Sequence, residues 1–372
     1  PTVRKIIRTF ARNRSSFRSV FAGRNFFLAF SFVVALVCSL RARAFPADNF
    51  GSKYSRGSFK FMTDDLPDDT LWVLDGTSML FRAHFKQNGN SYLAADGITE
   101  VSTLLAMGHD LANFIKNYDP KYLAMAFDVK RESTFRRHLM PTYKAQRPPY
   151  PNDLLLQIPL AFEMAKALGL KCFKHEGFEA DDVMATLANW ANSIGLGVVL
   201  VSDDKDMWQL VKDRVHIMGF KSSGVLTGEP EVYDKYGLKP HQLIDLIGLM
   251  GDSADNIPGI RGIGIKGAVA LLQEYHTIER IFDNLESIRN LNVRGAKGLS
   301  SKLNFPEAKQ NALLFKNIAT LRDDVPLEEL ENLKSSHLRY KGALPEAHKV
   351  MEVLGFKGPL RILQKRYDAR KF

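Results

Sequence analysis

Residues 177–206 read GFEADDVMATLANWANSIGLGVVLVSDDKD and place two acidic clusters around one helix and one strand. Val183 to Ser193 has the apolar spacing of a helix, and Gly197 to Val201 is an apolar run typical of a buried strand. Carboxylates this close together raise each other's pKa unless cations neutralise them. Mg²⁺ and Mn²⁺ are the usual partners of such all-oxygen sites, whereas the alternative is two solvated acidic turns.

Three apolar runs in the chain each end in acidic residues. The runs with their acids are Leu71–Leu74 with Asp75, Tyr122–Phe127 with Asp128, and Gly197–Val201 with Asp204 and Asp206. A long amphipathic helix is expected from Gly97 to Asn117, between the first two runs. This alternation predicts an α/β fold with a central, mostly parallel sheet, in which ligands bind at the carboxyl ends of the strands.

A separate acidic group precedes the third of these strands. Glu179, Asp181 and Asp182 lie at the start of the helix that leads into it. They join the acids at the sheet edge if that end of the helix lies nearby. Three strands that end in acids, together with this cluster, favour a shared site over a chance arrangement.

From Asp234 onward the pattern becomes helical with short connections. Asp252 and Asp255 stand in an i, i+3 relation, which one helical turn would place on the same face. A Gly-rich turn with Gly262 and Gly264 then opens a helix at Lys266, which exposes backbone N–H groups to a phosphate. The turn does not fit the P-loop pattern.

Basic and aromatic residues are interleaved between residues 130 and 151. The segment includes Arg136, Tyr143, Lys144 and Arg147. Such a mixture suits phosphate contact and base stacking, and the alternative is a solvated basic loop. Its position directly after the strand that ends at Asp128 favours a functional role.

Charge is distributed unevenly along the 372 residues. The formal net charge is +10, but residues 1–47 hold nine Arg and Lys and no acid, so that 10 − 9 leaves about +1 for the rest. The basic excess is therefore not a nucleic-acid footprint. Cys38 and Cys172 offer neither a disulfide framework nor zinc-ligand spacing, which indicates a compartment that does not require disulfide bridges.

Residues 1–44 have the features of a signal or targeting segment. They are Arg-rich, they hold an apolar run from Phe26 to Cys38 of signal-peptide length, and Ala42-Arg43-Ala44 offers a cleavage-like site. Residues 45–70 form a transit-like segment and linker. Together the two segments resemble the two-part presequences of algae with complex plastids, which favours a plastid over a mitochondrion. A membrane anchor is the third alternative.

Residues 71 to about 360 resemble the 5′→3′ exonuclease domain of bacterial DNA polymerase I and its stand-alone flap-endonuclease relatives. The matching motifs are Leu74-Asp75-Gly76, Ala126-Phe127-Asp128, Phe135-Arg136, Tyr143-Lys144, Arg147-Pro148-Pro149, Glu179-Ala180-Asp181-Asp182, Asp204-Lys205-Asp206, Gly251-Asp252 through Gly259, Gly264-x-Lys266 and Arg294-Gly295-Ala296-Lys297. The resemblance implies a PIN-like catalytic domain over residues 71–233, with a basic arch at 130–151. It implies a helical DNA-binding domain over 234–372 with a helix-hairpin-helix or helix-3-turn-helix element. No polymerase domain follows, so the chain resembles a stand-alone nuclease.

The resemblance also implies site residues. Asp75, Asp128, Glu179 and Asp181 would hold one Mg²⁺ with Asp182 close by, and Asp204, Asp206, Asp252 and Asp255 would form a second metal site. The implied DNA contacts are Arg136 and Lys144 in the arch, Tyr143 stacked on a base, Arg147, and the Gly262, Gly264 and Lys266 turn, which in some relatives binds K⁺. Arg136 and Lys144 would also stabilise the transition state. Asp203 departs from the family, whose close members have a small residue there, and it either joins the site or points away from it.

Asp75-Gly76-Thr77 also resembles the motif of haloacid-dehalogenase phosphatases, but Val73 stands where their nucleophilic aspartate would be. A PIN-type ribonuclease and a catalytically inactive DNA-structure binder remain as alternatives. The sequence therefore predicts a monomeric Mg²⁺-dependent nuclease acting on 5′ ends or flaps of DNA, with Mn²⁺ as a substitute ion. Organelle DNA replication or repair, with an organelle DNA polymerase as a partner, is the expected setting.

Overall fold

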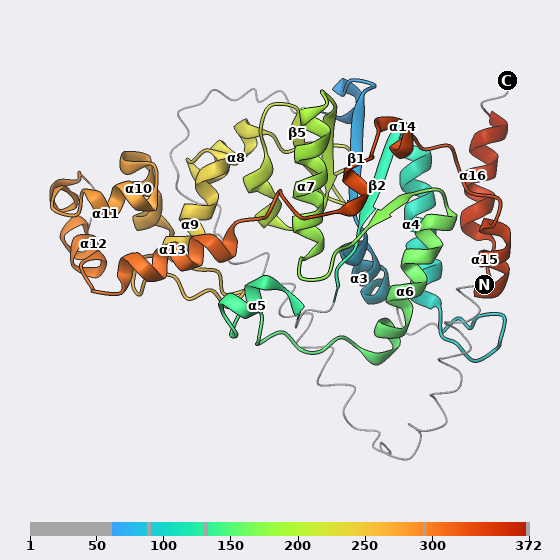
Figure 1. Cartoon of the computed structure of the whole chain (residues 1–372), viewed down its shortest axis with the longest axis horizontal. Helices are drawn as coiled ribbons and strands as arrows, with labels where there is room; N and C mark the ends of the chain where they lie inside the picture. Colours follow the sequence, from blue (N-terminus) through green and yellow to red (C-terminus); the bar gives the residue numbers. More distant parts are fainter. Residues whose placement is uncertain (1–61, 88–90, 130–132, 293–294, 370–372) are drawn as a thin grey trace, which may run out of the picture. The chain divides into compact units, whose positions relative to one another are not determined.

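The computed structural model describes residues 62–87, 91–129, 133–292 and 295–369 (Figure 1). The expected targeting segment at 1–44 and most of the transit-like segment, through residue 61, lie outside these ranges. Among the helices described, none has the length and apolar character that a membrane crossing requires.

A five-stranded parallel sheet forms the centre of the described chain, with strand order β3-β2-β1-β4-β5. The strands are β1 (Thr70–Asp75), β2 (Tyr122–Ala126), β3 (Lys171–Phe173), β4 (Gly197–Val201) and β5 (Val215–Met218). Leu74 of β1 pairs with Met125 of β2 and with Val201 of β4, so the three strands end at the same level. The predicted parallel sheet is therefore confirmed. The short strands β3 and β5 were not predicted.

Helices cover both faces of this sheet, because side chains alternate along each buried strand. Leu71 and Val73 pack into one core with residues of α7 (Ala180–Ser193). Trp72 points to the other side, where its ring lies 5.6 Å from that of Phe114 in α4 (Ser102–Tyr118). The remaining helices of this part are α3 (Gly76–Lys86), α5 (Phe135–Leu139) and α6 (Asn152–Ala167).

The helix expected from Gly97 to Asn117 begins later than predicted, at Ser102. Asp96 accepts hydrogen bonds from the backbone N–H groups of Ile98 and Thr99, each at 2.9 Å, and Gly97 has φ = +67°. This local turn competes with helix formation. Ile98, which was expected on the apolar helix face, is 47% exposed.

The helical part begins with α8 at Glu229, slightly before Asp234, where the sequence pattern becomes helical. Its helices are α8 (Glu229–Tyr236), α9 (Leu243–Met250), α10 (Ile265–Tyr275), α11 (Ile278–Asp283), α12 (Ala296–Leu303) and α13 (Ala308–Ala319). Short 3-10 helices occur at Thr63–Asp65, Lys205–Leu210, Pro240–Gln242, Ser287–Asn290 and Glu328–Leu330.

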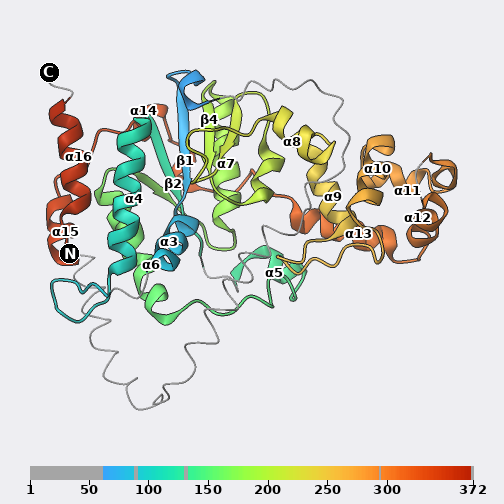
Figure 2. The ribbon, with the colours of Figure 1, turned by 180° about the vertical axis from the view of Figure 1, so that it is seen from behind.

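The last three helices return to the sheet part, so they depart from the expected assignment of residues 234–372 to one domain. They are α14 (Ser335–Leu338), α15 (Ala347–Leu354) and α16 (Gly358–Ala369). Tyr122 of β2 forms a β-bridge with Arg339, directly after α14. Helix α15 packs against α6, and α16 runs beside α4 in both views of the ribbon (Figures 1 and 2).

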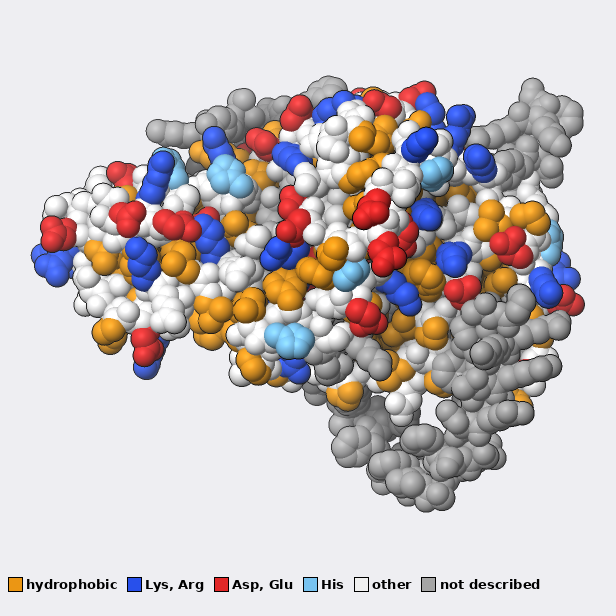
Figure 3. All heavy atoms as spheres, viewed as in Figure 1, with side chains coloured by type: hydrophobic (Ala, Val, Ile, Leu, Met, Phe, Trp, Pro, Cys, Tyr) orange, Lys and Arg blue, Asp and Glu red, His pale blue; other side chains and the backbone are white. Residues whose placement is uncertain are grey.

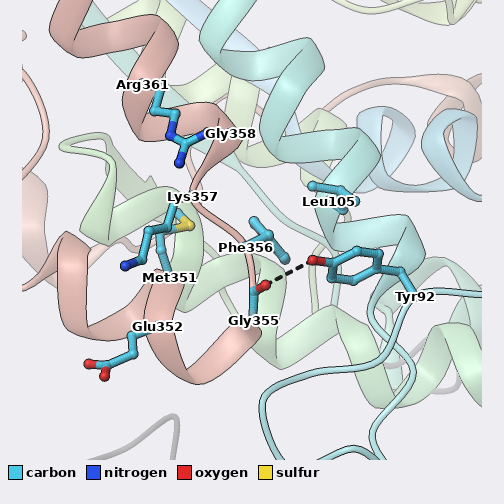
Figure 4. Close-up of a pocket in the computed structure, with 9 residues that line it drawn as sticks. All are labelled: Tyr92, Leu105, Met351, Glu352, Gly355, Phe356, Lys357, Gly358 and Arg361. Carbon is cyan, nitrogen blue, oxygen red and sulfur yellow. Dashed lines mark hydrogen bonds between the residues drawn. The ribbon is translucent and has the colours of Figure 1, made fainter.

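A pocket of about 430 Å³ lies where the chain between α3 and α4 meets the junction of α15 and α16 (Figure 4). Tyr92 lines it and donates a hydrogen bond of 2.9 Å to the carbonyl oxygen of Gly355. None of the acids at the strand ends lines this pocket. Acidic and basic side chains are interspersed on the face that Figure 3 shows, which agrees with the small net charge outside the N-terminal segment.

Candidate active site

Acidic residues from three strands meet at the carboxyl edge of the sheet. Asp75 ends β1 and caps α3: its Oδ1 accepts from the Ser78 N–H at 2.8 Å, and its Oδ2 accepts from the Ser202 hydroxyl at 3.1 Å. Asp128, two residues after β2, accepts from the Ala180 N–H at 2.6 Å. Since Ala180 is the first residue of α7, the end of this helix that carries Glu179, Asp181 and Asp182 lies at the same edge.

The Asp75-Gly76-Thr77 motif joins the ends of β1 and β2. The Thr77 hydroxyl accepts a 2.8 Å hydrogen bond from the backbone N–H of Asp128. A Cβ atom on Gly76 would lie 2.7 Å from the Phe127 ring and 2.9 Å from the carbonyl oxygen of Ala126, so glycine alone fits there. The motif therefore holds the two strand ends together, rather than supplying a phosphatase nucleophile.

The carboxylates at this edge are buried or half-buried beside one another, and too few cationic side chains lie near them to neutralise their charge. Burial, followed by the nearby Asp128, raises the pKa of Asp75 to about 7. Burial and Glu179 raise the pKa of Asp128. Burial, Asp204 and Asp75 raise the pKa of Asp181 well above its usual value. These carboxylates repel one another, which is the electrostatic condition for binding a cation.

A second acidic group adjoins the first through Asp204. Asp204 caps the 3-10 helix by accepting from the Asp206 N–H at 3.0 Å. Burial, then Asp204, Asp255 and Asp252, raise the pKa of Asp206 well above its usual value.

Asp252 and Asp255 do not lie on a helical turn as predicted. Helix α9 ends at Met250, and Asp252 exchanges two backbone hydrogen bonds of 2.8 Å with Ile257, which closes a tight loop. The loop still brings both carboxylates toward Asp206, since both contribute to its raised pKa.

The donor set fits a hard divalent ion in chemistry, because every candidate ligand is a carboxylate oxygen. Within the described residues, however, no three His, Cys, Asp or Glu side chains are gathered closely enough to form a ready metal site. The basic segment binds two of the predicted ligands, Glu179 and Asp255. Closing around an ion therefore requires Glu179 and Asp255 to exchange partners.

Residues 143–147 place their polar groups against Glu179 and Asp255. Lys144 Nζ lies 2.7 Å from Glu179 Oε1 and 3.6 Å from Asp255 Oδ2, and Arg147 Nη2 lies 2.5 Å from Asp255 Oδ1. Burial alone would raise the pKa of Glu179, but Lys144 and Arg136 lower it to about 2. Lys144 itself adopts φ = +52°, a conformation that few residues other than glycine hold.

Tyr143 is buried, contrary to its expected role of stacking on a base. Its side chain is 3% exposed, and its hydroxyl lies 3.0 Å from Glu179 Oε2 and 3.1 Å from Asp255 Oδ2. The hydroxyl thus lies between the two acids, and Arg136 also donates to the same Glu179 oxygen at 3.1 Å. The ring is therefore not available to a DNA base in this conformation.

Arg136 and Asp182 also depart from their expected roles. Arg136 is 1% exposed and pairs with both oxygens of Asp182, at 2.6 and 2.7 Å. Asp182 is fully buried. Arg136 is thus closed off from DNA, and Asp182 is closed off from a metal ion.

Asp203 points away from the acidic site. Its Oδ1 accepts a 2.9 Å hydrogen bond from the Phe220 N–H, and its Oδ2 lies 3.5 Å from Arg82 Nη1. The sequence left both orientations open, and these partners decide between them.

The Gly-rich turn opens α10 as predicted. Gly262 has φ = +81°, and its carbonyl oxygen accepts from Lys302 Nζ. Gly264 caps the helix in open surroundings, since a Cβ atom there would meet nothing within 4 Å. Lys266 is exposed in the first turn, where helix N–H groups have no intrahelical partner.

Three residues of the site were missed by the sequence reasoning. Ser202 and Thr77 hold the strand ends, and each stands two positions from a predicted acid, Asp204 or Asp75, which was an available signal. Tyr236 is the third residue. Burial, followed by the nearby Asp206 and Asp252, raises its pKa to about 12, which places its hydroxyl close to the second acidic group. It is far from these acids in sequence, so no local pattern indicates it.

Family models match most of the described chain. The model described as "5′-3′ exonuclease, N-terminal resolvase-like domain" matches residues 70–237, and "5′-3′ exonuclease, C-terminal SAM fold" matches residues 238–341. Together they cover the sheet, the acidic edge and the helices through α14.

Curated relatives agree with this match. The chain is 39% identical over 264 residues to a "5′-3′ exonuclease" of Buchnera aphidicola, which covers 71% of this chain and 90% of that protein. It is 34% identical over 276 residues to "DNA polymerase I" of Bacillus subtilis, which covers 73% of this chain but only 29% of the polymerase.

A solved structure shares the fold. The bacteriophage T5 D15 flap endonuclease, in a pseudo-enzyme-product complex with DNA and metal ions, has a TM-score of 0.53 at 20% identity. The match covers 82% of this chain and 100% of the T5 chain. The parallel sheet and the helices after it thus form a PIN-like nuclease fold followed by a helical SAM-like part.

Proposed function

Because the chain belongs to the 5′-3′ exonuclease family of nucleases, we propose that it is a Mg²⁺-dependent 5′→3′ exonuclease and structure-specific flap endonuclease acting on DNA. The observation that carries the proposal is the group of buried and half-buried carboxylates at one edge of the parallel sheet. Asp75, Asp128, Asp181 and Asp206 all have raised pKa values there because of burial and one another. Only a cation relieves such repulsion without protonation.

Two groups of residues would hold the ions. Asp75, Asp128, Glu179 and Asp181 would form one site, and Asp204, Asp206, Asp252 and Asp255 the other. When bound, such a metal pair activates water at neutral pH and stabilises charge at the scissile phosphate.

The protein's own groups orient these carboxylates. Ser78 N–H and the Ser202 hydroxyl hold both oxygens of Asp75, and the α7 backbone at Ala180 holds Asp128. Lys144 and Arg147 supply positive charge beside Glu179 and Asp255. In the T5 flap endonuclease complex, a protein of this fold is bound to DNA and metal ions, which supports the proposed metal dependence and the proposed action on DNA.

The duplex-binding part of the proposal rests on the turn before α10. Exposed N–H groups at its start, together with Lys266, suit a DNA phosphate. The proposal includes a helix-hairpin-helix element at this turn, where backbone carbonyl oxygens around Gly262 and Gly264 would hold K⁺ in place of the Lys302 ammonium that now donates to Gly262.

The cellular part of the proposal rests on residues 1–62. Their Arg-rich, signal-like and transit-like segments support import into an organelle, a plastid ahead of a mitochondrion. Primer or flap removal in organelle DNA replication and repair, as a monomer beside an organelle DNA polymerase, is the proposed role. A fluorescent protein fused after residues 1–62 should enter that organelle, and diffuse fluorescence would contradict the targeting proposal.

The first experiment distinguishes the three candidate functions. The full chain is incubated with a 5′-labelled flap duplex, a blunt duplex and single-stranded RNA, each with Mg²⁺ and with EDTA. Mg²⁺-dependent cutting near the flap junction is expected. Cutting of RNA alone would assign a PIN-type ribonuclease. Tight flap binding without cutting in Mg²⁺ or Mn²⁺ would assign an inactive DNA-structure binder.

A further inference from the structure

We infer that Arg136 and Asp182 are positioning residues, which fix Glu179 and the start of α7 against the helical part. Arg136 uses all five of its N–H donors. Its partners are Asp182 Oδ2 at 2.6 Å, Asp182 Oδ1 at 2.7 Å, Ile318 O at 2.8 Å, Thr320 O at 2.9 Å and Glu179 Oε2 at 3.1 Å. A guanidinium has no further donor to offer a phosphate.

Asp182 is equally occupied. Besides Arg136, its Oδ1 accepts from the Arg322 N–H at 2.8 Å, and its Oδ2 accepts from the Glu179 N–H at 3.0 Å. Each oxygen thus receives two hydrogen bonds, which is the ordinary capacity of a carboxylate. No lone pair remains for a metal ion.

The pair joins three separate segments of the chain. Arg136 belongs to α5 in the basic segment, and Asp182 belongs to the first turn of α7. Their backbone partners at 318–322 begin in the last turn of α13 and continue into the chain after it. Glu179 is held at its backbone N–H by Asp182 and at its carboxylate by Arg136. Glu179 is therefore positioned from both sides, and Asp181 lies in the same first turn.

A positioning role has a consequence that a purely stabilising one lacks. Partners of metal ligands orient them, and their loss typically weakens metal affinity by about 10- to 100-fold. Removing one member of a buried ion pair leaves a desolvated charge and threatens the fold, whereas replacing both by apolar residues of similar size is often tolerated. The informative variant is therefore the double one, Arg136→Met with Asp182→Leu.

The experiment rests on the proposed function and compares three full-length proteins. These are the wild type, the double variant, and a control with Arg322→Ala and Asp324→Ala. The control removes an exposed bidentate pair, at 2.9 and 2.8 Å, from the segment that Arg136 also contacts. In this control the backbone N–H of residue 322 can still donate to Asp182. Each folded protein is titrated with Mn²⁺ by electron paramagnetic resonance without DNA, and with Mg²⁺ in flap cleavage.

We expect the double variant to bind Mn²⁺ about tenfold more weakly and to need about tenfold more Mg²⁺ for half-maximal cleavage. Its KM for flap DNA should stay within about twofold of the wild type, and the control should match the wild type throughout. Unchanged metal affinity in the folded double variant would overturn the inference. Weaker DNA binding with unchanged metal affinity would also overturn it, since Arg136 would then contact DNA.

A second variant keeps the test decisive if the double variant does not fold. Asp182→Asn keeps the size of the side chain but loses the charge and half of its acceptors, so it should shift Mn²⁺ affinity in the same direction by a smaller factor. Wild-type affinity in this variant would contradict the inference. If the wild type itself neither binds Mn²⁺ nor cleaves, the proposed function fails, which is a separate result.

Discussion

Lys144 Nζ lies 2.7 Å from Oε1 of Glu179, one of the carboxylates that would hold a metal ion. The ammonium group neutralises a buried carboxylate whose pKa is about 2. A divalent ion held by this oxygen would compete with Lys144 for it.

Lys144→Met should separate metal binding from cleavage. Without the competing ammonium, Mn²⁺ binding to the DNA-free protein should tighten roughly three- to tenfold, because one favourable ion pair no longer has to break. Flap cleavage should nevertheless fall, since a positive charge beside the scissile phosphate is lost. Weaker Mn²⁺ binding in the variant would contradict this competition. The same titration on Lys116→Ala, an exposed residue of α4, serves as the control.

Adjacent aspartates should behave differently, because only one of them faces the other carboxylates. Asp204→Asn should lower flap cleavage by at least about a hundredfold, since metal ligation contributes several kcal/mol of transition-state stabilisation. DNA binding should be largely retained. Asp203→Asn is the matched control and should cleave within about twofold of the wild type, because Asp203 binds Phe220 N–H and Arg82 instead. Equal losses in both variants would remove this assignment.

The stability of the metal-free protein should fall as pH rises toward 7. Burial and then Asp128 raise the pKa of Asp75 from 3.8 to about 7, so the folded state holds this proton more tightly than the unfolded chain. Its stabilising contribution is complete below about pH 4 and is lost as pH rises through about 7.

Asp75→Asn removes this loss, because an amide does not ionise. At pH 8 in EDTA its free energy of unfolding should exceed that of the wild type by on the order of 1 kcal/mol or more. The difference should shrink as pH falls toward 5 in urea unfolding. Added Mg²⁺ should stabilise the wild type more than the variant, by mass action on the folded state. A difference independent of pH would show that Asp75 does not titrate as described.

The strand-end acids could be predicted because they obey local rules. An apolar run followed by an acid puts Asp75, Asp128 and Asp204 at one edge of a parallel sheet, whatever the rest of the chain does. The basic segment does not follow such a rule. The basic and aromatic composition and the family resemblance predicted that Arg136 would meet DNA, but its partners Glu179, Asp182 and Ile318 lie 43, 46 and 182 residues away along the chain.

Two smaller errors have local causes that the pattern of apolar residues hides. Asp96 holds a turn that delays α4, and the paired backbone of Asp252 and Ile257 replaces an expected helical turn. In both places an Asp or Gly supplies a backbone arrangement that competes with the helix. The spacing of apolar residues along the sequence is the same whichever conformation forms, so sequence periodicity does not distinguish a turn from a helix at these places.

The turn before α10 should contribute to DNA affinity in a way that salt reveals. Lys266→Ala should weaken binding to a nicked or flap duplex about equally for different sequences, because a phosphate contact carries no base information. The slope of log affinity against log salt should decrease by about 1, since one fewer counterion is released. Fluorescence anisotropy between 50 and 200 mM salt, with Ca²⁺ in place of Mg²⁺ to prevent cutting, measures both quantities. Lys116→Ala on α4 should change neither. A weaker affinity with an unaltered slope would mean that Lys266 supports the fold of the turn. If Lys266→Ala matches the wild type in both affinity and slope, Lys266 makes no contact in the duplex interface.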